Sequence, residues 1–215
     1  NYDESRLRML RVPYVISGSG KKVPEDTGTY PKSALVTTDT EIESQSMVDY
    51  LCSCGHKRIA FITSGDEGLG RCHLNGYKRS LEKNGLEYDE KLIIRLKPGR
   101  RIYTIENGYN CTCELLKSGV DFSCIYAISD TLAVGACRAV IDSGKRVPED
   151  YCVAGADGQD IAEYYHPSIT TLKYPRVEIA LQSVRTLFDL INRKKVVKRQ
   201  ILGGTLIERE STRKL

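Results

Sequence analysis

The chain has 215 residues, of which 40% are hydrophobic and 28% charged, as in an ordinary globular protein of one or two domains. No apolar run approaches the roughly 18 to 20 residues that span a bilayer, and the polar N-terminal residues lack the apolar core of a secretion signal. The net charge of +4 is modest, and the basic cluster at 193–199 is interpreted as a solvated helix end in preference to a phosphate-binding face. Composition therefore argues against a membrane protein and a nucleic-acid-binding domain, and it predicts a cytoplasmic location.

Strand-like and helix-like patterns alternate along nearly the whole chain. In chain order, the predicted elements are a strand at 12–17, a helix at 41–51, a strand at 58–63, a helix at 72–83, a strand at 92–96, a helix at 103–117, a strand at 124–129, a helix at 130–143, a strand at 151–155, a short helix at 159–164, a helix at 176–192 and a strand at 200–208. Asp130 is predicted to cap the N-terminus of its helix. Strands that alternate with helices predict βαβ units and parallel sheets, hence an α/β fold.

The eight cysteines raise the question of disulfides or a metal site. Two pairs have C-x-C spacing, whereas zinc sites typically use C-x2-C, and three other cysteines lie in apolar patterns where Cys acts as a small hydrophobe. A metal site of Cys52, Cys54 and His56 is the less favoured alternative. Reduced, structural thiols of a cytosolic protein are expected.

The motifs that would indicate nucleotide binding or catalysis are incomplete. The loop at 18–22 resembles a phosphate loop, but Val15 and Lys22 replace the required Gly and Ser or Thr, so a mobile loop is expected there. The glycines at 68–70 suit a dinucleotide site, but His73 replaces the third Gly. No G-x-S-x-G elbow and no acid pair stand out. We therefore predict no enzyme activity, no cofactor and no metal.

Six ordered segments together resemble the effector domain of LacI/GalR-type bacterial transcription regulators. They are residues 55–62 (GHKRIAFI), 76–86 (GYKRSLEKNGL), 128–136 (ISDTLAVGA), 147–157 (VPEDYCVAGAD), 167–172 (PSITTL) and 206–211 (LIERES). Their order and spacing follow the family throughout, and six ordered motifs are far more specific than any one.

The resemblance implies a type I periplasmic-binding-protein-like fold, in which two parallel-sheet α/β lobes are joined by three crossing strands and hold a ligand in the cleft between them. It assigns residues 1–56 and 174–199 to the N-terminal lobe, and residues 57–173 and 200–215 to the C-terminal lobe. The family also implies further βα units and a helix-turn-helix domain ahead of residue 1. The N-terminal lobe is therefore expected to be incomplete in this chain.

The resemblance also implies the positions of ligand contacts. The candidate set is Asp157, His73, Arg71, Ser129, Ser17 and Asp39. Asp157 matches an acidic residue that commonly hydrogen-bonds ligand hydroxyls, and its structural alternative is to cap the helix at 159–164. His73 stands where the family usually has a clamping Arg, whose planar fork His cannot reproduce, and an ordinary His at a helix start is weighed equally. For Asp130, capping is put before ligand contact.

These features predict the ligand-sensing domain of a transcription regulator. A small effector, with a sugar as the first candidate, would bind between the lobes and shift the DNA affinity of a homodimer. DNA contact would need the helix-turn-helix domain, and no membrane partner is expected. The alternative is an extracytoplasmic sugar-binding protein of the same fold, against which the apparently unpaired cysteines argue because that compartment is oxidising.

Overall fold

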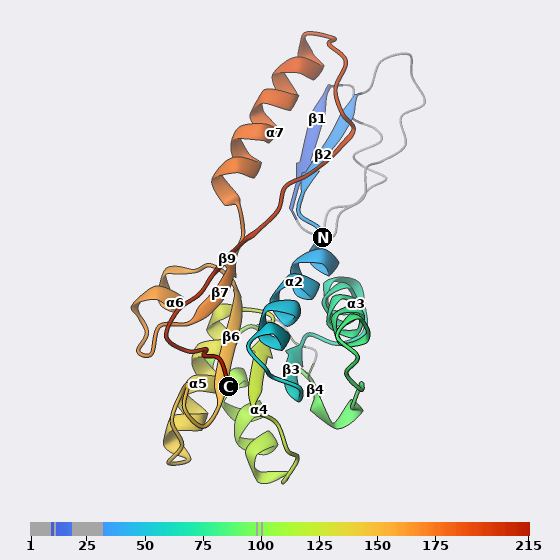
Figure 1. Ribbon diagram of the computed structural model, residues 1–215. Coiled ribbons are helices and arrows are strands. Elements are labelled where there is room, and N and C mark those ends of the chain that lie inside the picture. Colours follow the sequence, from blue (N-terminus) through green and yellow to red (C-terminus); the bar gives the residue numbers. More distant parts are fainter. Residues whose placement is uncertain (1–9, 11, 19–31, 98, 100) are drawn as a thin grey trace. The chain divides into compact units, whose positions relative to one another are not determined.

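A computed structural model describes residues 10, 12–18, 32–97, 99 and 101–215 of the chain (Figure 1). The chain forms two compact α/β units, a smaller one from the residues up to Asp39 and Pro175–Gly203, and a larger one from Thr40–Tyr174 and Gly204–Leu215. The chain passes between the units three times, as the family resemblance implies. The loop predicted at 18–22 falls outside the described residues except for Gly18.

The smaller unit is a short parallel sheet with one helix along it. Its strands have the order β1 (Tyr14–Ser17), β2 (Ser33–Thr37) and β8 (Arg199–Ile201). The helix α7 (Arg176–Ile191) lies along β1 and β2 (Figure 1). Every residue of β2 is buried, which suits a strand between two neighbours and beneath a helix.

The larger unit is built on a sheet of strand order β4-β3-β5-β6-β7-β9, parallel except at β9. Its elements in chain order are α2 (Thr40–Ser53), β3 (Ile59–Thr63), α3 (Gly68–Lys83), the 3-10 turn η1 (Glu90–Leu92), β4 (Ile93–Arg95), α4 (Ile105–Lys117), β5 (Cys124–Ala127), α5 (Asp130–Asp142), β6 (Cys152–Asp157), α6 (Asp160–Tyr164), β7 (Thr170–Lys173) and β9 (Thr205–Ile207). None of the helices in the described ranges has the length and apolar character needed to cross a membrane.

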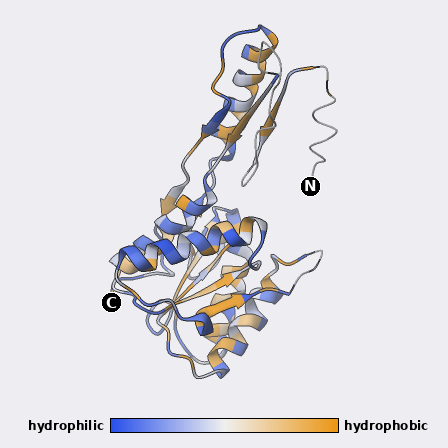
Figure 2. Cartoon of the chain, turned by 90° about the vertical axis from the view of Figure 1, so that its right-hand side faces the viewer, coloured by the Kyte–Doolittle hydropathy of each residue, from blue (hydrophilic) through white to orange (hydrophobic). Residues whose placement is uncertain are grey.

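Helices cover both faces of this sheet. The chain goes outward from β3 to β4 through α3 and then returns past β3 to β5 through α4, so the strand order reverses between β3 and β5. Since parallel crossovers are right-handed, α3 lies on one face with α2, and α4 lies on the other with α5 (Figure 1). The strands between these layers are coloured as hydrophobic in Figure 2, which marks the core of the unit.

The core at the strand-order reversal is aromatic. Phe61 on β3 stacks on Tyr77 of α3, with ring centroids 5.0 Å apart, and on Tyr126 of β5, with centroids 5.1 Å apart. The Tyr77 hydroxyl donates to the carbonyl oxygen of Ile59, at 2.8 Å. These contacts fix α3 over β3 and β5, the two strands whose ends build the candidate site.

Several elements differ from those expected. The predicted final strand is two strands, β8 and β9, in the sheets of different units, with Gly203 and Gly204 between them. Helix α3 begins at Gly68 rather than at residue 72, because the glycine-rich segment already belongs to its first turn. Strands β2 and β7 were not expected from the pattern, since their buried polar residues, such as Thr170 and Thr171, read as loop.

Two segments belong to a different compact unit from the lobe that the family resemblance implies for them. Helix α2 belongs to the larger unit, although the resemblance assigns residues 1–56 to the N-terminal lobe. Gly76 explains why: a Cβ there would lie 2.2 Å from the carbonyl oxygen of Glu41, so α2 and α3 pack almost backbone to backbone. Strand β8 belongs to the smaller unit because it pairs with β2, although residues 200–215 were assigned to the other lobe.

Candidate functional site

The larger unit gathers four of the candidate residues at one edge of its sheet. Arg71 and His73 follow β3, Ser129 follows β5, and Asp157 ends β6, and these three strands are neighbours in the parallel sheet. Their carboxyl ends therefore meet at the same edge, on either side of the point where the strand order reverses. Open α/β sheets bind ligands at this point.

Asp157 ends β6 in a left-handed conformation, with φ of +99°, and Gly158 follows with φ of +63°. The residue is half-buried, and its carboxylate accepts a hydrogen bond from the side-chain amide of Gln159, at 3.1 Å. The capping alternative for Asp157 is wrong, because the N-cap of α6 is Gln159, whose side chain makes no cap bond. The carboxylate of Asp157 is therefore not used to start that helix.

The predicted capping role of Asp130 is also wrong. Ser129 is the N-cap of α5, and its hydroxyl oxygen accepts from the backbone N–H of Leu132, at 3.3 Å. Asp130 is the first helical residue, and its fully buried carboxylate accepts from the N–H of Gln159 and from the hydroxyl of Thr171, each at 2.6 Å. Burial raises the pKa of Asp130 to about 6, although these two hydrogen bonds favour the charged form.

Ser129 is a less open candidate than its position suggested. It is only 3% exposed, and besides its cap bond its hydroxyl lies 3.1 Å from that of Thr131. Its hydrogen-bonding capacity is largely used within the fold.

The two candidates on α3 differ in charge and exposure. Arg71 is exposed in the first turn of the helix. His73 is half-buried, and burial lowers the pKa of its imidazole to about 4, so this ring is neutral at pH 7. Its backbone carbonyl accepts from the Ser44 hydroxyl, at 2.8 Å, while its Nδ1 finds no hydrogen-bond partner within the described part of the chain. His73 is therefore neutral and brings no positive charge to this edge of the sheet.

The remaining two candidates belong to the smaller unit. Ser17 is the exposed last residue of β1, and the half-buried Asp39 comes two residues after β2. Both lie at or just after the carboxyl ends of parallel strands, as a ligand-contacting role would require.

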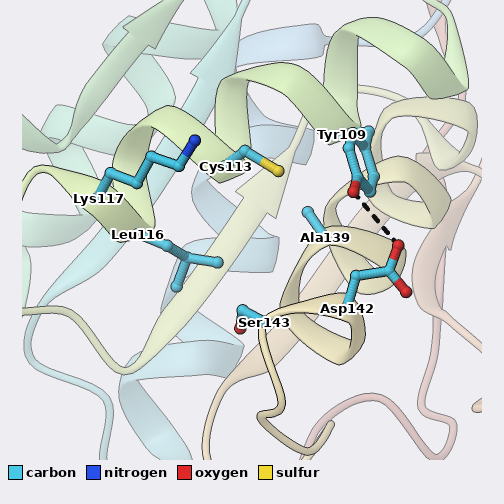
Figure 3. A pocket seen from close by; sticks show the side chains of 7 residues that line it. All are labelled: Tyr109, Cys113, Leu116, Lys117, Ala139, Asp142 and Ser143. Atoms are coloured by element: carbon cyan, nitrogen blue, oxygen red, sulfur yellow. Dashed lines mark hydrogen bonds between the residues drawn. The ribbon is translucent and has the colours of Figure 1, made fainter.

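A second feature of the larger unit is a groove between α4 and α5, with a volume of about 270 Å³ (Figure 3). It is lined by Tyr109, Cys113, Leu116, Lys117, Ala139, Asp142 and Ser143. The Tyr109 hydroxyl donates to the Asp142 carboxylate across it, at 3.2 Å. Apart from Tyr109, these residues lie in the C-terminal halves of α4 and α5 or just after α5, so most of the groove lies away from the strand ends that carry the candidate site.

The cysteines give no catalytic or metal-binding arrangement in the described residues. All eight are free thiols, and no group of three metal-ligating side chains is found in the ranges that the structure describes. Burial raises the pKa of the thiols of Cys124, Cys137 and Cys152, which keeps these side chains protonated and unreactive.

Comparison with known proteins identifies the fold family. A family model described as a periplasmic binding protein-like domain matches residues 48–212. A crystal structure of a sugar-binding LacI-family regulator from Escherichia coli, complexed with phosphate, superposes with a TM-score of 0.79 at 28% identity, over 92% of this chain and 68% of that one. This chain belongs to the LacI family. It has the family's periplasmic-binding-protein-like effector domain, which confirms the resemblance of the six segments.

Two further relatives refine this assignment. The HTH-type transcriptional regulator MalR of Clostridium butyricum is 33% identical, over 91% of this chain and 63% of its own length. The structure of a CelR–cellobiose complex has a TM-score of 0.77 at 32% identity, over 93% of this chain and 59% of that one. The LacI-family chain described here thus spans less than two thirds of these relatives.

The sequence analysis did not identify the residues that hydrogen-bond to Asp130 beneath the candidate site. Thr171 and Gln159 were not among the candidates, although both bond to Asp130. Thr171 lies in the family segment 167–172, so that segment was the available signal. Its role could not be inferred, because its partner is 41 residues away in the sequence.

Proposed function

We propose that the larger unit binds a small polyhydroxylated effector, with a sugar as the first candidate, at the carboxyl ends of β3, β5 and β6. The observation that carries this proposal is the half-buried residue Asp157 at the end of a central strand, whose conformation is fixed by the turn that follows. A carboxylate accepts strong hydrogen bonds from hydroxyl groups, and a vicinal diol can supply two of them. The CelR structure with cellobiose, and that of an Enterococcus faecium family member with ribose, support a sugar by analogy.

The charge of the site favours a neutral sugar over a sugar phosphate. Asp157 and Asp130 both lie at this edge, while His73 is neutral at pH 7 and Arg71 is the one cation among the four candidates of the larger unit. An anionic group beside two carboxylates would be repelled. Ser17 and Asp39 in the smaller unit stay predictions.

Thermal unfolding of the chain with a panel of sugars tests this proposal. Cellobiose, maltose, ribose and glucose 6-phosphate are suitable probes. A ligand present at 100 times its dissociation constant should stabilise the chain by roughly 2.7 kcal/mol. Asp157→Ala should weaken binding of the best neutral sugar by about one to two orders of magnitude, because a hydrogen bond to a charged group contributes about 1.5 to 3 kcal/mol.

Glu87→Ala is the matched control. Glu87 is an exposed carboxylate in the loop after α3, at the opposite edge of the sheet. The control variant should bind like the wild type. Unchanged affinity in Asp157→Ala, or a preference for glucose 6-phosphate over every neutral sugar, would contradict the proposal.

We further propose that the effector acts through a homodimer and changes the DNA affinity of the whole regulator. The relatives are HTH-type regulators, which supports a cytoplasmic, non-catalytic role, and the DNA-binding step belongs to the whole protein rather than to these 215 residues. The apolar groove on α4 and α5 supports a contact with a second copy there. Exposed apolar side chains lie on the same helices, including Ile105 at 42% and Ile141 at 39% exposure.

Analytical ultracentrifugation tests the dimer. Wild type should sediment as a dimer, and the double variant Ile105→Glu/Ile141→Glu should shift toward the monomer, because four carboxylates would be buried at the contact. Val197→Glu changes an equally apolar, 65% exposed residue of the smaller unit and serves as the control. A wild-type chain that stays monomeric, or a double variant that still dimerises, would refute this part of the proposal.

A further inference from the structure

We propose that Asp130 is a positioning residue for Asp157: it holds the turn of residues 157–159, named here the Asp157 turn, in the conformation that presents the Asp157 carboxylate to the effector. This inference deepens the proposed function and rests on it. It arises from a buried carboxylate that neither caps its own helix nor contributes to an ion pair among the described residues, yet bonds to two other segments.

Both oxygens of the Asp130 carboxylate are committed to the Asp157 turn. Oδ2 accepts directly from the backbone N–H of Gln159, at 2.6 Å. Oδ1 accepts from the Thr171 hydroxyl, also at 2.6 Å. Because that hydroxyl donates its only proton to Asp130, its oxygen is free to accept, and it does so from the N–H of Gly158, at 3.3 Å. The two amides that follow Asp157 are therefore tied to Asp130, one directly and one through Thr171.

The backbone of the turn needs such a restraint. Asp157 has φ of +99°, a conformation that a residue with a side chain adopts rarely, at a cost of order 1 to 3 kcal/mol. A strained backbone of this kind persists only where its surroundings impose it. Without the bonds to Gly158 and Gln159, the Asp157 turn would relax, and the carboxylate would point elsewhere.

Gly155 on β6 makes the arrangement possible. A Cβ at this position would lie 2.4 Å from Oδ1 of Asp130 and 3.2 Å from its Cα. Only glycine lets the carboxylate lie against β6 while it reaches Thr171 on the next strand. Gly155, in the segment AGAD at 154–157, therefore leaves the space that Asp130 needs to hold the Asp157 turn.

Capping does not explain the position of Asp130. The Ser129 hydroxyl already accepts a hydrogen bond from a backbone N–H in the first turn of α5. An acidic residue in the first turn also stabilises a helix electrostatically, but this effect needs no contact with residues 159 and 171. A merely structural Asp130 would affect folding alone. A positioning Asp130 affects effector binding through Asp157.

The test compares Asp130→Ala, Asp130→Asn and Thr171→Val, alone and combined with Asp157→Ala. Affinity is measured by calorimetric titration with the best-binding sugar of the panel, and amide hydrogen exchange is followed by NMR. We expect Asp130→Ala and Thr171→Val each to weaken binding about tenfold and to accelerate exchange at Gly158 and Gln159. Asp130→Asn keeps a side-chain acceptor and should restore most of the affinity.

The double variants separate positioning from a direct or global effect. Once Asp157 is alanine, Asp130→Ala and Thr171→Val should change the affinity less than about twofold, because the contact they support is already lost. Asp121→Asn changes an exposed carboxylate in the loop before β5, at the opposite edge of the sheet; it is the matched control and should bind and exchange at these two amides like the wild type. Full additivity with Asp157→Ala, or wild-type affinity in both Asp130→Ala and Thr171→Val, would overturn the proposal.

The exchange measurement needs no ligand, so it distinguishes the two ways of failing. If no sugar binds the wild-type chain, the proposed function is overturned, and the effector side of this inference falls with it. If exchange at Gly158 and Gln159 is unchanged in Thr171→Val, which can fold even where Asp130→Ala does not, then Asp130 does not hold the turn, whatever the chain binds.

Discussion

At the scale of single residues, Asp130 shows where sequence reasoning stops. The sequence predicted Asp130 as the N-cap, but the adjacent Ser129, which is an equally good N-cap residue, takes that role. The Asp130 carboxylate instead hydrogen-bonds to Gln159 and Thr171, which are 29 and 41 residues away in the sequence. No local sequence pattern reveals these partners. Asp157 could be singled out only through the family segment that contains it, because its left-handed backbone has no signal in its own side chain.

The raised pKa of Asp130 predicts a pH dependence of stability. Its pKa is about 6 in the fold, above the ordinary value of 3.8, so the folded state holds this proton more tightly. The stabilisation by protonated Asp130 is therefore complete below about pH 4 and is lost as the pH rises through 6. The neighbouring charges are Asp157, which raises the pKa, and Arg209, which lowers it.

Chemical denaturation of wild type and Asp130→Asn at pH 5 and pH 7 measures this effect. From pH 5 to pH 7, wild type should lose about 1 kcal/mol relative to the variant, whose amide does not titrate. Other carboxylates are common to both proteins and cancel. A difference in unfolding free energy that is constant between the two pH values would show that Asp130 titrates near its ordinary pKa.

At the scale of elements, helices were easier to predict than strands. The amphipathic pattern placed α4, α5 and α7 to within two residues of their observed ends. The strands β2 and β7 escaped notice because buried threonines and serines are satisfied by hydrogen bonds that only the folded sheet supplies, such as that from Thr170 N–H to the Ser211 hydroxyl, at 2.8 Å.

The close packing of α2 on α3 predicts a large cost for Gly76→Ala. The added methyl would meet the Glu41 carbonyl oxygen at 2.2 Å and the Ser44 Cβ at 2.8 Å, so the helices must separate. We expect a loss of about 1 to 3 kcal/mol in unfolding free energy. Gly203→Ala, at a glycine with no atom within 4 Å of the added methyl, is the control and should be close to neutral. Equal effects of the two substitutions would disprove the close contact.

Helix α7 carries the most exposed apolar surface of the smaller unit. Five residues at helical spacing, each between 53% and 66% exposed, form a stripe of Val177, Leu181, Val184, Phe188 and Ile191. Exposed apolar patches of this kind favour association. The double variant Leu181→Gln/Phe188→Gln should bind less of the dye ANS and associate less at high concentration, with its melting temperature nearly unchanged. Arg185→Gln introduces a glutamine at an exposed polar position of the same helix and is the control; equal dye binding by all three proteins would contradict the prediction.

At the scale of the whole molecule, the alternation of strands and helices predicted parallel α/β sheets, and the six ordered segments predicted the family. The distribution of segments between units was harder to foresee. Helix α2 joins the larger unit through the backbone contact at Gly76, and β8 joins the smaller one through pairing with β2. Such contacts depend on three-dimensional packing, so composition and periodicity do not reveal them.

We propose that a sugar binds at the strand ends beside Asp157. The most direct measurement is an NMR titration of the isotopically labelled chain with the best-binding sugar of the panel, recording backbone amide shifts. We expect saturable changes concentrated at residues 64–73, 128–131 and 157–160, and their loss at the same sugar concentration in Asp157→Ala. Changes confined to the groove between α4 and α5, or no change with any neutral sugar, would contradict it.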